Sequence, residues 1–141
     1  MQTNSEALDD TDMQKRLRDA GLRPTRQRIG LANLLFSGDC RHVTAEELFA
    51  EANAAALSVS LATVYNTLRQ FVDVGLLREV LVDPGRAYFD TNIFDHHHFF
   101  HVAEGRLEDV PVDAVSIAKL PLAPAGAMVE RVDVVIRLNK A

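Results

Sequence analysis

The chain of 141 residues contains a single cysteine, Cys40, and no tryptophan. One thiol excludes an internal disulfide, and it excludes a zinc site that takes two or more thiolates from one chain. No apolar stretch approaches the ~20 residues that a membrane-spanning helix needs. Residues 1–12 are polar and acidic, without the apolar segment of a secretion signal. These absences predict a cytoplasmic protein with no membrane partner and no cysteine-ligated structural zinc.

The charge of the chain is acidic overall, with a formal net charge of −5. An acidic total argues against a nucleic-acid partner, but the distribution of the charges matters more. Six basic residues lie within fourteen positions, opposed only by an aspartate at position 19: Lys15, Arg16, Arg18, Arg23, Arg26 and Arg28. Such a cluster is compatible with a DNA contact on one face, and equally with a solvated helix face.

Helix-capping residues mark the first half of the chain. Thr25, Thr44 and Ser60 each precede a segment with helical periodicity, and Gly75 ends the last of these segments. A shorter helix is expected over 13–20. In the segment after position 60, apolar side chains recur at three- and four-residue spacing and predict a buried stripe of Leu61, Val64, Tyr65, Leu68, Phe71 and Val72. The opposite face carries Thr63, Asn66, Arg69, Gln70 and Asp73.

Strand patterns follow the helices. Residues 76–82 and 86–90 read as two strands around a Pro-Gly turn. Helices followed by a β-hairpin predict a winged helix-turn-helix, in which the last helix enters the major groove of DNA. Further strands are expected from three short apolar runs and from an alternating final segment, over 98–103, 107–112, 115–120 and 132–138.

The expected fold class is therefore α+β, an N-terminal winged helix-turn-helix followed by a small α/β or mostly β dimerisation domain. We predict a disordered tail over 1–12, a DNA-binding domain over 13–90, and a dimerisation and effector-binding domain over 91–141. A four-stranded sheet of ~50 residues is too small to be stable alone, so we expect a homodimer.

Four of the five histidines fall within six residues, in the run Asp95-His96-His97-His98-Phe99-Phe100-His101. Imidazole is the commonest metal ligand in proteins. On an extended segment alternate side chains share a face, so His96 and His98 point one way and His97 the other. Nitrogen and oxygen ligands without thiolate suit Fe(II), Mn(II) or Zn(II). The plain alternative is that these histidines merely lie on a loop.

The segments Gly21–Arg28, His42–Leu48 and Ser60–Leu68, together with the histidine run, resemble the ferric uptake regulator family in order and spacing. The Leu-Ala-Thr-Val-Tyr stretch of the third segment is the most specific of these motifs. Within the family the chain most resembles the iron response regulator (Irr) branch, through its Asp-His-His-His-Phe-Phe run, its missing cysteine pair and its Val-Asp-Val-Val-Ile-Arg-Leu ending. The resemblance implies a repressor or activator of iron and heme metabolism genes.

The resemblance also implies which residues contact DNA. Arg23 matches a basic residue that enters an A·T-rich minor groove, and Thr63 and Tyr65 match residues of the recognition helix that face DNA. The resemblance implies that Tyr65 can contact thymine methyl groups and phosphate. Asn66 stands where the family often has arginine, and asparagine can read adenine through two hydrogen bonds. We add Arg69 because it lies on the same polar face. The implied partner is double-stranded DNA with an A·T-rich palindromic operator, bound by a homodimer.

For the effector, the resemblance implies a divalent metal held by His42, His96, His98 and a carboxylate near Asp90. In the Irr branch the histidine run takes part in heme binding, which makes the candidate heme residues here His96, His97 and His98. Imidazole is a sound axial ligand, and three phenylalanines are available to pack on the porphyrin, namely Phe94, Phe99 and Phe100. The Cys-Pro heme motif of some Irr members is absent, because Cys40 is followed by Arg41.

Two other readings stay open. One is a Mn(II)-, Fe(II)- or peroxide-sensing repressor of the same family that uses no heme. The other is a metal-dependent hydrolase built on His96 and His98, which would need a general base and an open coordination position. Asp95 and Glu104 are nearby, but the sequence contains no nucleophile elbow and no zincin motif. We therefore expect that the protein is not an enzyme.

Overall fold

The structure is a computed structural model that describes residues 10–141. Two compact units divide the chain, the first ending at Ile93 and the second running from Phe94 to Ala141. The division falls three residues beyond the boundary expected between positions 90 and 91. Of the tail expected over 1–12, residues 1–9 lie outside the described part, and Asp10–Asp12 are helical rather than disordered.

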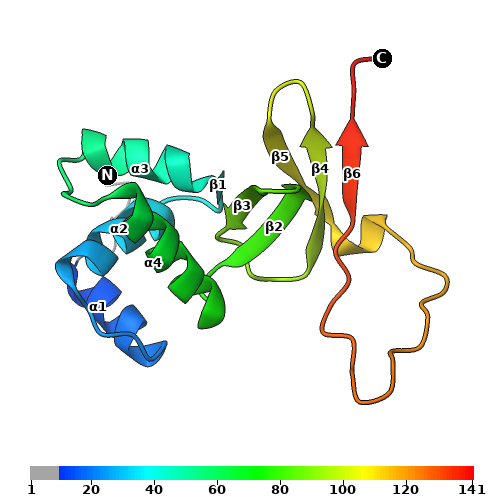
Figure 1. Cartoon of the computed structure of the whole chain (residues 1–141), viewed down its shortest axis with the longest axis horizontal. Helices are drawn as coiled ribbons and strands as arrows, with labels where there is room; N and C mark the ends of the chain where they lie inside the picture. Colours follow the sequence, from blue (N-terminus) through cyan, green and yellow to red (C-terminus); the bar gives the residue numbers. More distant parts are fainter. Residues whose placement is uncertain (1–9) are drawn as a thin grey trace, which may run out of the picture. The chain divides into compact units, whose positions relative to one another are not determined.

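Within residues 10–93, the described part of the first unit contains four helices (Figure 1): α1 (Asp10–Asp19), α2 (Arg26–Phe36), α3 (Ala45–Ala54) and α4 (Leu61–Asp73). The three predicted caps are confirmed. The side chains of Thr25, Thr44 and Ser60 each accept a hydrogen bond from the backbone N–H three residues on, which satisfies one of the unpaired donors of the first turn. Gly75 follows α4 with a φ of +80°, a left-handed conformation that favours glycine.

The core of the first unit lies between these helices. It contains Leu31 and Leu35 of α2, Leu48 of α3 and the buried stripe of α4, whose members are Val64, Thr67, Leu68 and Phe71. The prediction that Tyr65 belongs to this stripe was wrong, because its side chain is 45% exposed. Each helical residue turns by about 100°, and that turn takes the residue after Val64 off the apolar face.

A three-stranded antiparallel sheet completes the first unit, with β1 (His42–Val43), β2 (Arg78–Asp83) and β3 (Arg86–Asp90) in the order β1-β3-β2. The hairpin of β2 and β3 is the predicted wing, although β2 begins two residues later than expected. The wing turn contains Gly85 with a φ of +76°. The short strand β1 was not predicted.

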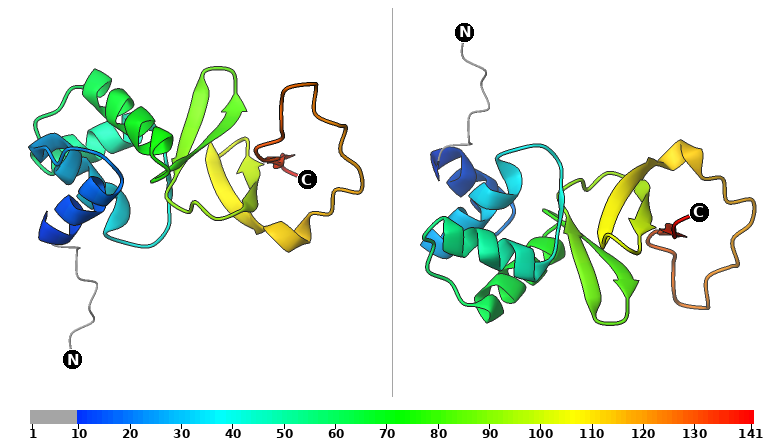
Figure 2. Two further views of the ribbon diagram at one scale, coloured as in Figure 1. Left: turned by 90° about the horizontal axis from the view of Figure 1, so that it is seen from below. Right: turned by 90° about the horizontal axis from the view of Figure 1, so that it is seen from above.

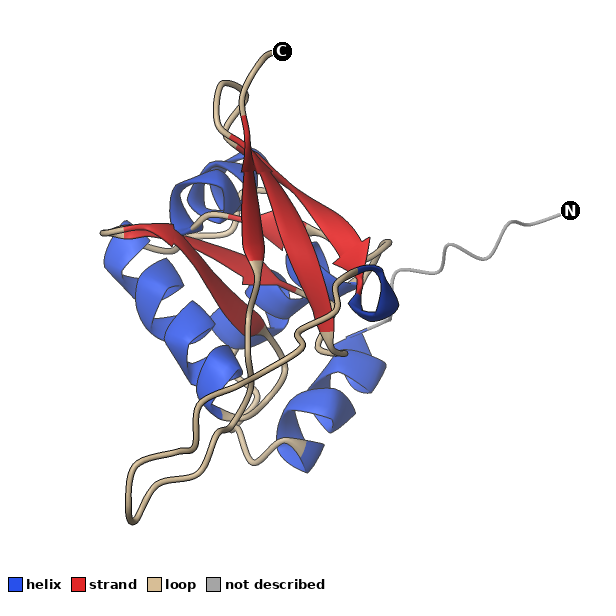
Figure 3. Ribbon diagram, turned by 90° about the vertical axis from the view of Figure 1, so that its right-hand side faces the viewer, coloured by secondary structure: helices blue, strands red, loops and turns tan. Residues whose placement is uncertain are grey.

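The second unit contains a separate sheet (Figure 2), in which β4 (His96–His101) pairs with β5 (Arg106–Pro111) antiparallel and with β6 (Val135–Leu138) parallel. The second unit therefore contains three strands, one fewer than the four that we expected. A 3-10 turn, η1 (Val112–Ala114), follows β5. The next residues, 115–134, form neither helix nor strand. Figure 3 shows this long connection in tan. Pro121 and Pro124 lack the backbone N–H that a strand ladder requires.

Helices followed by small sheets confirm the predicted α+β class and the winged-helix arrangement of the first unit. Among residues 10–141, the helices are all too short or too polar to cross a membrane.

Candidate functional site

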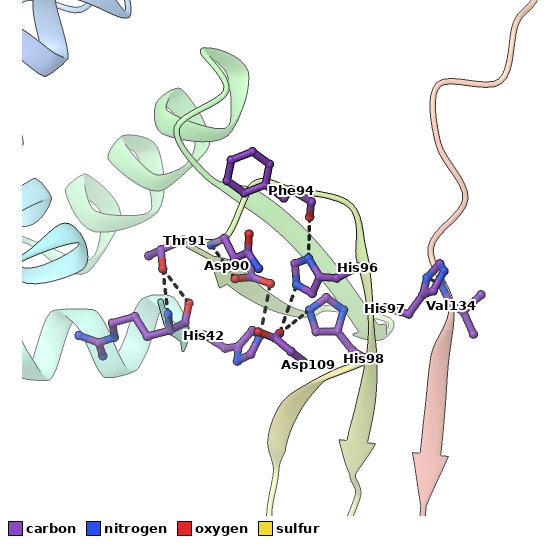
Figure 4. Close-up of polar contacts among 11 residues, drawn as sticks. His42, Asp90, Thr91, Phe94, His96, His97, His98, Asp109 and Val134 are labelled. Atoms are coloured by element: carbon purple, nitrogen blue, oxygen red, sulfur yellow. Dashed lines mark hydrogen bonds and ion pairs between the residues drawn. The ribbon is translucent and has the colours of Figure 1, made fainter. Parts of the chain in front are cut away.

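The β4–β5 ladder brings a carboxylate to the histidine run. His98 lies directly opposite Asp109 in the antiparallel register, and side chains so placed have Cβ atoms about 4.5–5.5 Å apart. His96 lies two residues earlier on the same face of β4. The Nε2 atoms of His96 and His98 are 3.2 and 3.5 Å from Asp109 Oδ1 (Figure 4). The predicted alternation of faces along β4 therefore places both imidazoles around one carboxylate.

A backbone contact orients the His96 ring. Its Nδ1 lies 2.6 Å from the carbonyl oxygen of Phe94, and because a carbonyl oxygen only accepts, Nδ1 must carry the donated proton. In the neutral ring the lone pair is then on Nε2, the atom that faces Asp109. A lone pair directed at a carboxylate oxygen is stabilised only by a proton or a cation between them. Such a carbonyl contact is also the usual arrangement behind a metal-bound histidine.

Burial in this cluster is uneven. The side chains of His96 and His98 are 6% and 4% exposed, whereas that of Asp109 is 44% exposed. Ligand atoms of the three residues lie within 4.8 Å of one another. Two imidazole nitrogens and a carboxylate oxygen fit Fe(II), Mn(II) or Zn(II), and the donor set contains no thiolate.

A second histidine–carboxylate pair lies within the first unit. His42 of β1 is directly opposite Asp90 of β3 in the sheet register, and His42 Nε2 lies 3.3 Å from Asp90 Oδ2. The Asp90 side chain is 1% exposed, and its Oδ1 accepts a hydrogen bond from the backbone N–H of Asn92. The neighbouring Arg41 forms a two-fold ion pair with Glu51 of α3, and this hydrogen bonding raises the pKa of the Arg41 guanidinium.

The remaining predicted heme residue lies elsewhere. His97 is on the opposite face of β4 from its two neighbours, and its Nδ1 accepts a hydrogen bond of 3.2 Å from the backbone N–H of Val134. His101 lies at the end of β4, and its Nε2 forms a hydrogen bond of 3.1 Å with Oε1 of Glu108 on β5. That hydrogen bond lowers the pKa of the Glu108 carboxyl.

Asp109 is a candidate ligand that the sequence analysis did not predict. A signal was present, because Asp109 lies two residues after the buried Leu107 and therefore on the same face of β5, where an acidic side chain is unexpected. Only the hairpin register pairs it with His98, and the register depends on the length of the turn.

The five residues predicted for DNA contact all lie in the first unit: Arg23 in the loop before α2, and Thr63, Tyr65, Asn66 and Arg69 on α4. The loop is tied to α4 through Arg28 of α2. Its guanidinium donates to the Arg23 carbonyl at 2.8 Å and to the Gln70 side chain of α4. Arg23, Tyr65, Asn66 and Arg69 are exposed, and Thr63 is half-buried.

Two of these side chains contact carboxylates of neighbouring elements. The Tyr65 hydroxyl donates to Glu46 in the first turn of α3, and the Arg69 guanidinium pairs with Glu79 of β2. The first hydrogen bond lowers the pKa of the Glu46 carboxyl and raises the pKa of the Tyr65 phenol. At neutral pH the pair is therefore a carboxylate accepting from a neutral phenol.

The fold and the histidine–aspartate cluster define a winged-helix protein with a candidate metal centre. The comparison with known families is more specific. The chain belongs to the ferric uptake regulator family, whose model matches residues 19–134. The resemblance seen in the sequence is thereby confirmed for the family, while the Irr branch stays a prediction.

Similar proteins agree with this assignment. The chain is 36% identical over 84 residues to the ferric uptake regulation protein of Bordetella parapertussis, and this match covers 60% of each of the two chains. It is 34% identical over 93 residues to the peroxide-responsive repressor PerR of Staphylococcus aureus, covering 66% of this chain and 62% of that protein. The matches thus span less than two thirds of either relative.

Solved structures match over a longer range. The ferric uptake regulator of Vibrio cholerae aligns with a TM-score of 0.73 at 25% identity, covering 90% of this chain and 98% of that one. The Pseudomonas aeruginosa regulator, solved with manganese, aligns with a TM-score of 0.68 at 27% identity, covering 91% and 97% of the two chains.

Proposed function

We propose that the protein is a metal-responsive regulator of transcription that binds double-stranded DNA as a homodimer. The observation that carries this proposal is the cluster of His96, His98 and Asp109 in a chain whose other unit is a winged helix. The names of its relatives, which concern ferric uptake and peroxide response, support control of iron metabolism genes. A role on DNA also implies a cytoplasmic location and requires no catalysis.

For the effector, we place one Fe(II), Mn(II) or Zn(II) ion on His96, His98 and Asp109, with His42 and Asp90 as further ligands. The support is the chemistry of the two sets, imidazole and carboxylate in each. Only five residues separate Asp90 from His96 in the chain, so the two sets flank the boundary between the units. Binding of the ion would regulate transcription if its occupancy changes the affinity for DNA, which is a coupling free energy between two sites.

For DNA, we place α4 in the major groove, with Thr63, Tyr65, Asn66 and Arg69 as the contacting residues. Asn66 is exposed and can pair with adenine through two hydrogen bonds. Arg23 lies on an exposed loop and is suited to a narrow A·T-rich minor groove, where the negative potential is strongest.

The homodimer is supported by the surface of the second unit. Large apolar side chains are exposed along residues 112–136, at Val112, Ile117, Leu120, Leu122, Met128, Val129, Val132 and Ile136. Apolar surface of this extent indicates a site of association. Two copies would place their α4 helices in successive major grooves about 34 Å apart, which requires a palindromic operator.

Binding of DNA is tested by selecting ligands from a pool of random duplexes with the Mn(II)-loaded protein. We expect an A·T-rich palindrome, with an affinity that falls at least about tenfold between ~50 and ~200 mM salt because phosphate contacts release counterions. Selection of no common sequence, together with an affinity insensitive to salt, would contradict a DNA-binding function.

Heme sensing, as in the Irr branch, is the second candidate for the effector, since three histidines are adjacent. The structure favours a bare metal ion, because His97 faces away from His96 and His98, and Phe100 is fully buried rather than available to a porphyrin. We expect that adding the protein leaves the absorption spectrum of free hemin unchanged. A sharp Soret shift that disappears in His96→Ala/His97→Ala/His98→Ala would establish heme instead.

Peroxide sensing is the third candidate, suggested by the similarity to PerR. Fe(II) is oxidised by hydrogen peroxide in one-electron steps, whereas Mn(II) is far less reactive. A peroxide sensor would therefore release DNA after peroxide treatment of the Fe(II)-loaded protein and retain DNA in the Mn(II)-loaded form. Equal retention by both forms would leave the metal itself as the signal.

A further inference from the structure

The exposed face of α4 carries one aromatic ring, and that ring is held at its outer end. The Tyr65 side chain is 45% exposed, and its hydroxyl donates a hydrogen bond of 2.5 Å to Glu46 Oε1. Glu46 belongs to the first turn of α3, the helix that precedes α4 and packs against it. The orientation of the ring therefore depends on a second helix as well as on its own backbone.

This contact decides what Tyr65 can offer to a ligand. A phenol has one O–H donor, and here Glu46 accepts it, so the donor is not directed at a DNA phosphate. The pKa of the carboxyl is lowered and that of the phenol is raised by the same hydrogen bond, which keeps the pair in this form at neutral pH. What remains for DNA is the apolar face of the ring.

The position of Glu46 has a cost for a DNA-binding surface. An exposed carboxylate beside α4 repels the phosphates of a duplex bound to that helix. Removing it by substitution would by electrostatics alone strengthen binding to any DNA sequence. If the hydrogen bond of Glu46 positions Tyr65, removing Glu46 would instead change the preference of the protein among bases.

We propose that Glu46 is a positioning residue that fixes the Tyr65 ring on the exposed face of α4. The family resemblance implies that this ring contacts the C5-methyl group of thymine, and the new element is that Glu46 makes that contact selective. The inference rests on the proposed function, because it assumes that α4 lies in the major groove, where that methyl group is displayed. Burial of one methyl group corresponds to about a fourfold change in affinity.

The test compares two duplexes of the selected sequence, one with thymine and one with uracil at every thymine position. Uracil keeps every Watson–Crick hydrogen bond and lacks only the methyl group. We expect the wild type to bind the thymine duplex at least about fourfold more tightly. In Glu46→Ala this preference should fall toward one, while affinity for the uracil duplex stays the same or rises.

Three further variants separate positioning from charge. Glu46→Gln keeps an oxygen acceptor without the charge and should retain the thymine preference, as should Glu47→Gln, which removes the adjacent carboxylate of α3. Tyr65→Phe removes the tether and should lose the preference, and adding Glu46→Ala to it should cause no further loss, because the two residues act as one unit.

The possible results separate the positioning role of Glu46 from DNA binding itself. A wild type that binds DNA without preferring thymine, or a Glu46→Ala protein that keeps the full preference, would overturn the positioning role and leave DNA binding intact. Binding of neither duplex by the wild type would overturn the proposed function and this inference with it.

Discussion

At the scale of single residues, the candidate metal centre depends on one aspartate that is half exposed. Asp109 contacts the two buried imidazoles of His96 and His98, and it is the most exposed of the three side chains. The adjacent carboxylate, Glu108, points to the other face of β5 and pairs with His101 instead. The two neighbours therefore provide a test and its control within one strand.

We predict that Asp109→Asn weakens Mn(II) binding by at least about 100-fold, since loss of outer-shell partners alone costs 10–100-fold. Isothermal titration calorimetry of the whole protein measures the affinity. Glu108→Gln should bind Mn(II) as the wild type does. Equal loss in both variants would show that general acidity of β5, rather than ligation by Asp109, attracts the metal.

A second residue-scale prediction concerns Arg23. Because a narrow minor groove concentrates negative potential, Arg23→Ala should weaken binding mainly to operators with A·T-rich flanks, by roughly tenfold or more at a cost of about 1–3 kcal/mol. Fluorescence anisotropy with A·T-flanked and G·C-flanked duplexes gives the comparison. A uniform loss on both duplexes would mean that Arg23 only neutralises phosphate.

At the scale of helices and strands, the N-terminal caps determine where the helices of the winged unit begin. The Thr44 side chain accepts the backbone N–H of Glu47 at 3.1 Å, and α3 then carries Glu46 into its place beside α4. We predict that Thr44→Ala lowers the free energy of unfolding by about 1 kcal/mol, measured by urea denaturation. Thr44→Ser keeps the hydroxyl and should stay within a few tenths of the wild type; a matching loss there would rule out the cap as the cause.

The same elements show what can be predicted from residues alone. Thr25, Thr44 and Ser60 marked three helix starts correctly, because capping depends on residues three positions apart. Strand pairing depends on distant segments, and two errors follow from that. The two-residue strand β1 is too short to have a periodicity, and the pairing of Asp109 with His98 depends on hairpin register.

The expected fourth strand over 115–120 failed for a related reason. Its alternation of apolar and small residues is weak, and two prolines follow it in the linker. A strand also needs a neighbouring edge with which to pair, and sequence periodicity carries no information about that edge.

At the scale of the whole molecule, the exposed apolar residues of the second unit require a partner surface. Leu122 and Met128 are 96% and 89% exposed. If a second copy covers them, Leu122→Lys/Met128→Lys should raise the dimer dissociation constant at least about tenfold, since each buried side chain contributes about 1.5–3 kcal/mol. Sedimentation velocity across a concentration series measures this constant.

The control for this prediction is Leu81→Lys. Leu81 is also an exposed apolar residue, at 64%, but it lies on the wing of the first unit. It should leave the dimer unchanged. Dimers of unaltered stability in the double variant would show that residues 115–134 do not take part in association.

Metal-responsive regulation requires a coupling between the imidazole–carboxylate cluster and the affinity for DNA. The direct measurement is anisotropy titration of the selected duplex, with and without saturating Mn(II), for the wild type and for His96→Ala/His98→Ala. We predict that Mn(II) changes the affinity of the wild type by at least about tenfold, within the usual range of such couplings, and leaves the variant unaffected. An identical response in both proteins, or none in the wild type, would contradict the account.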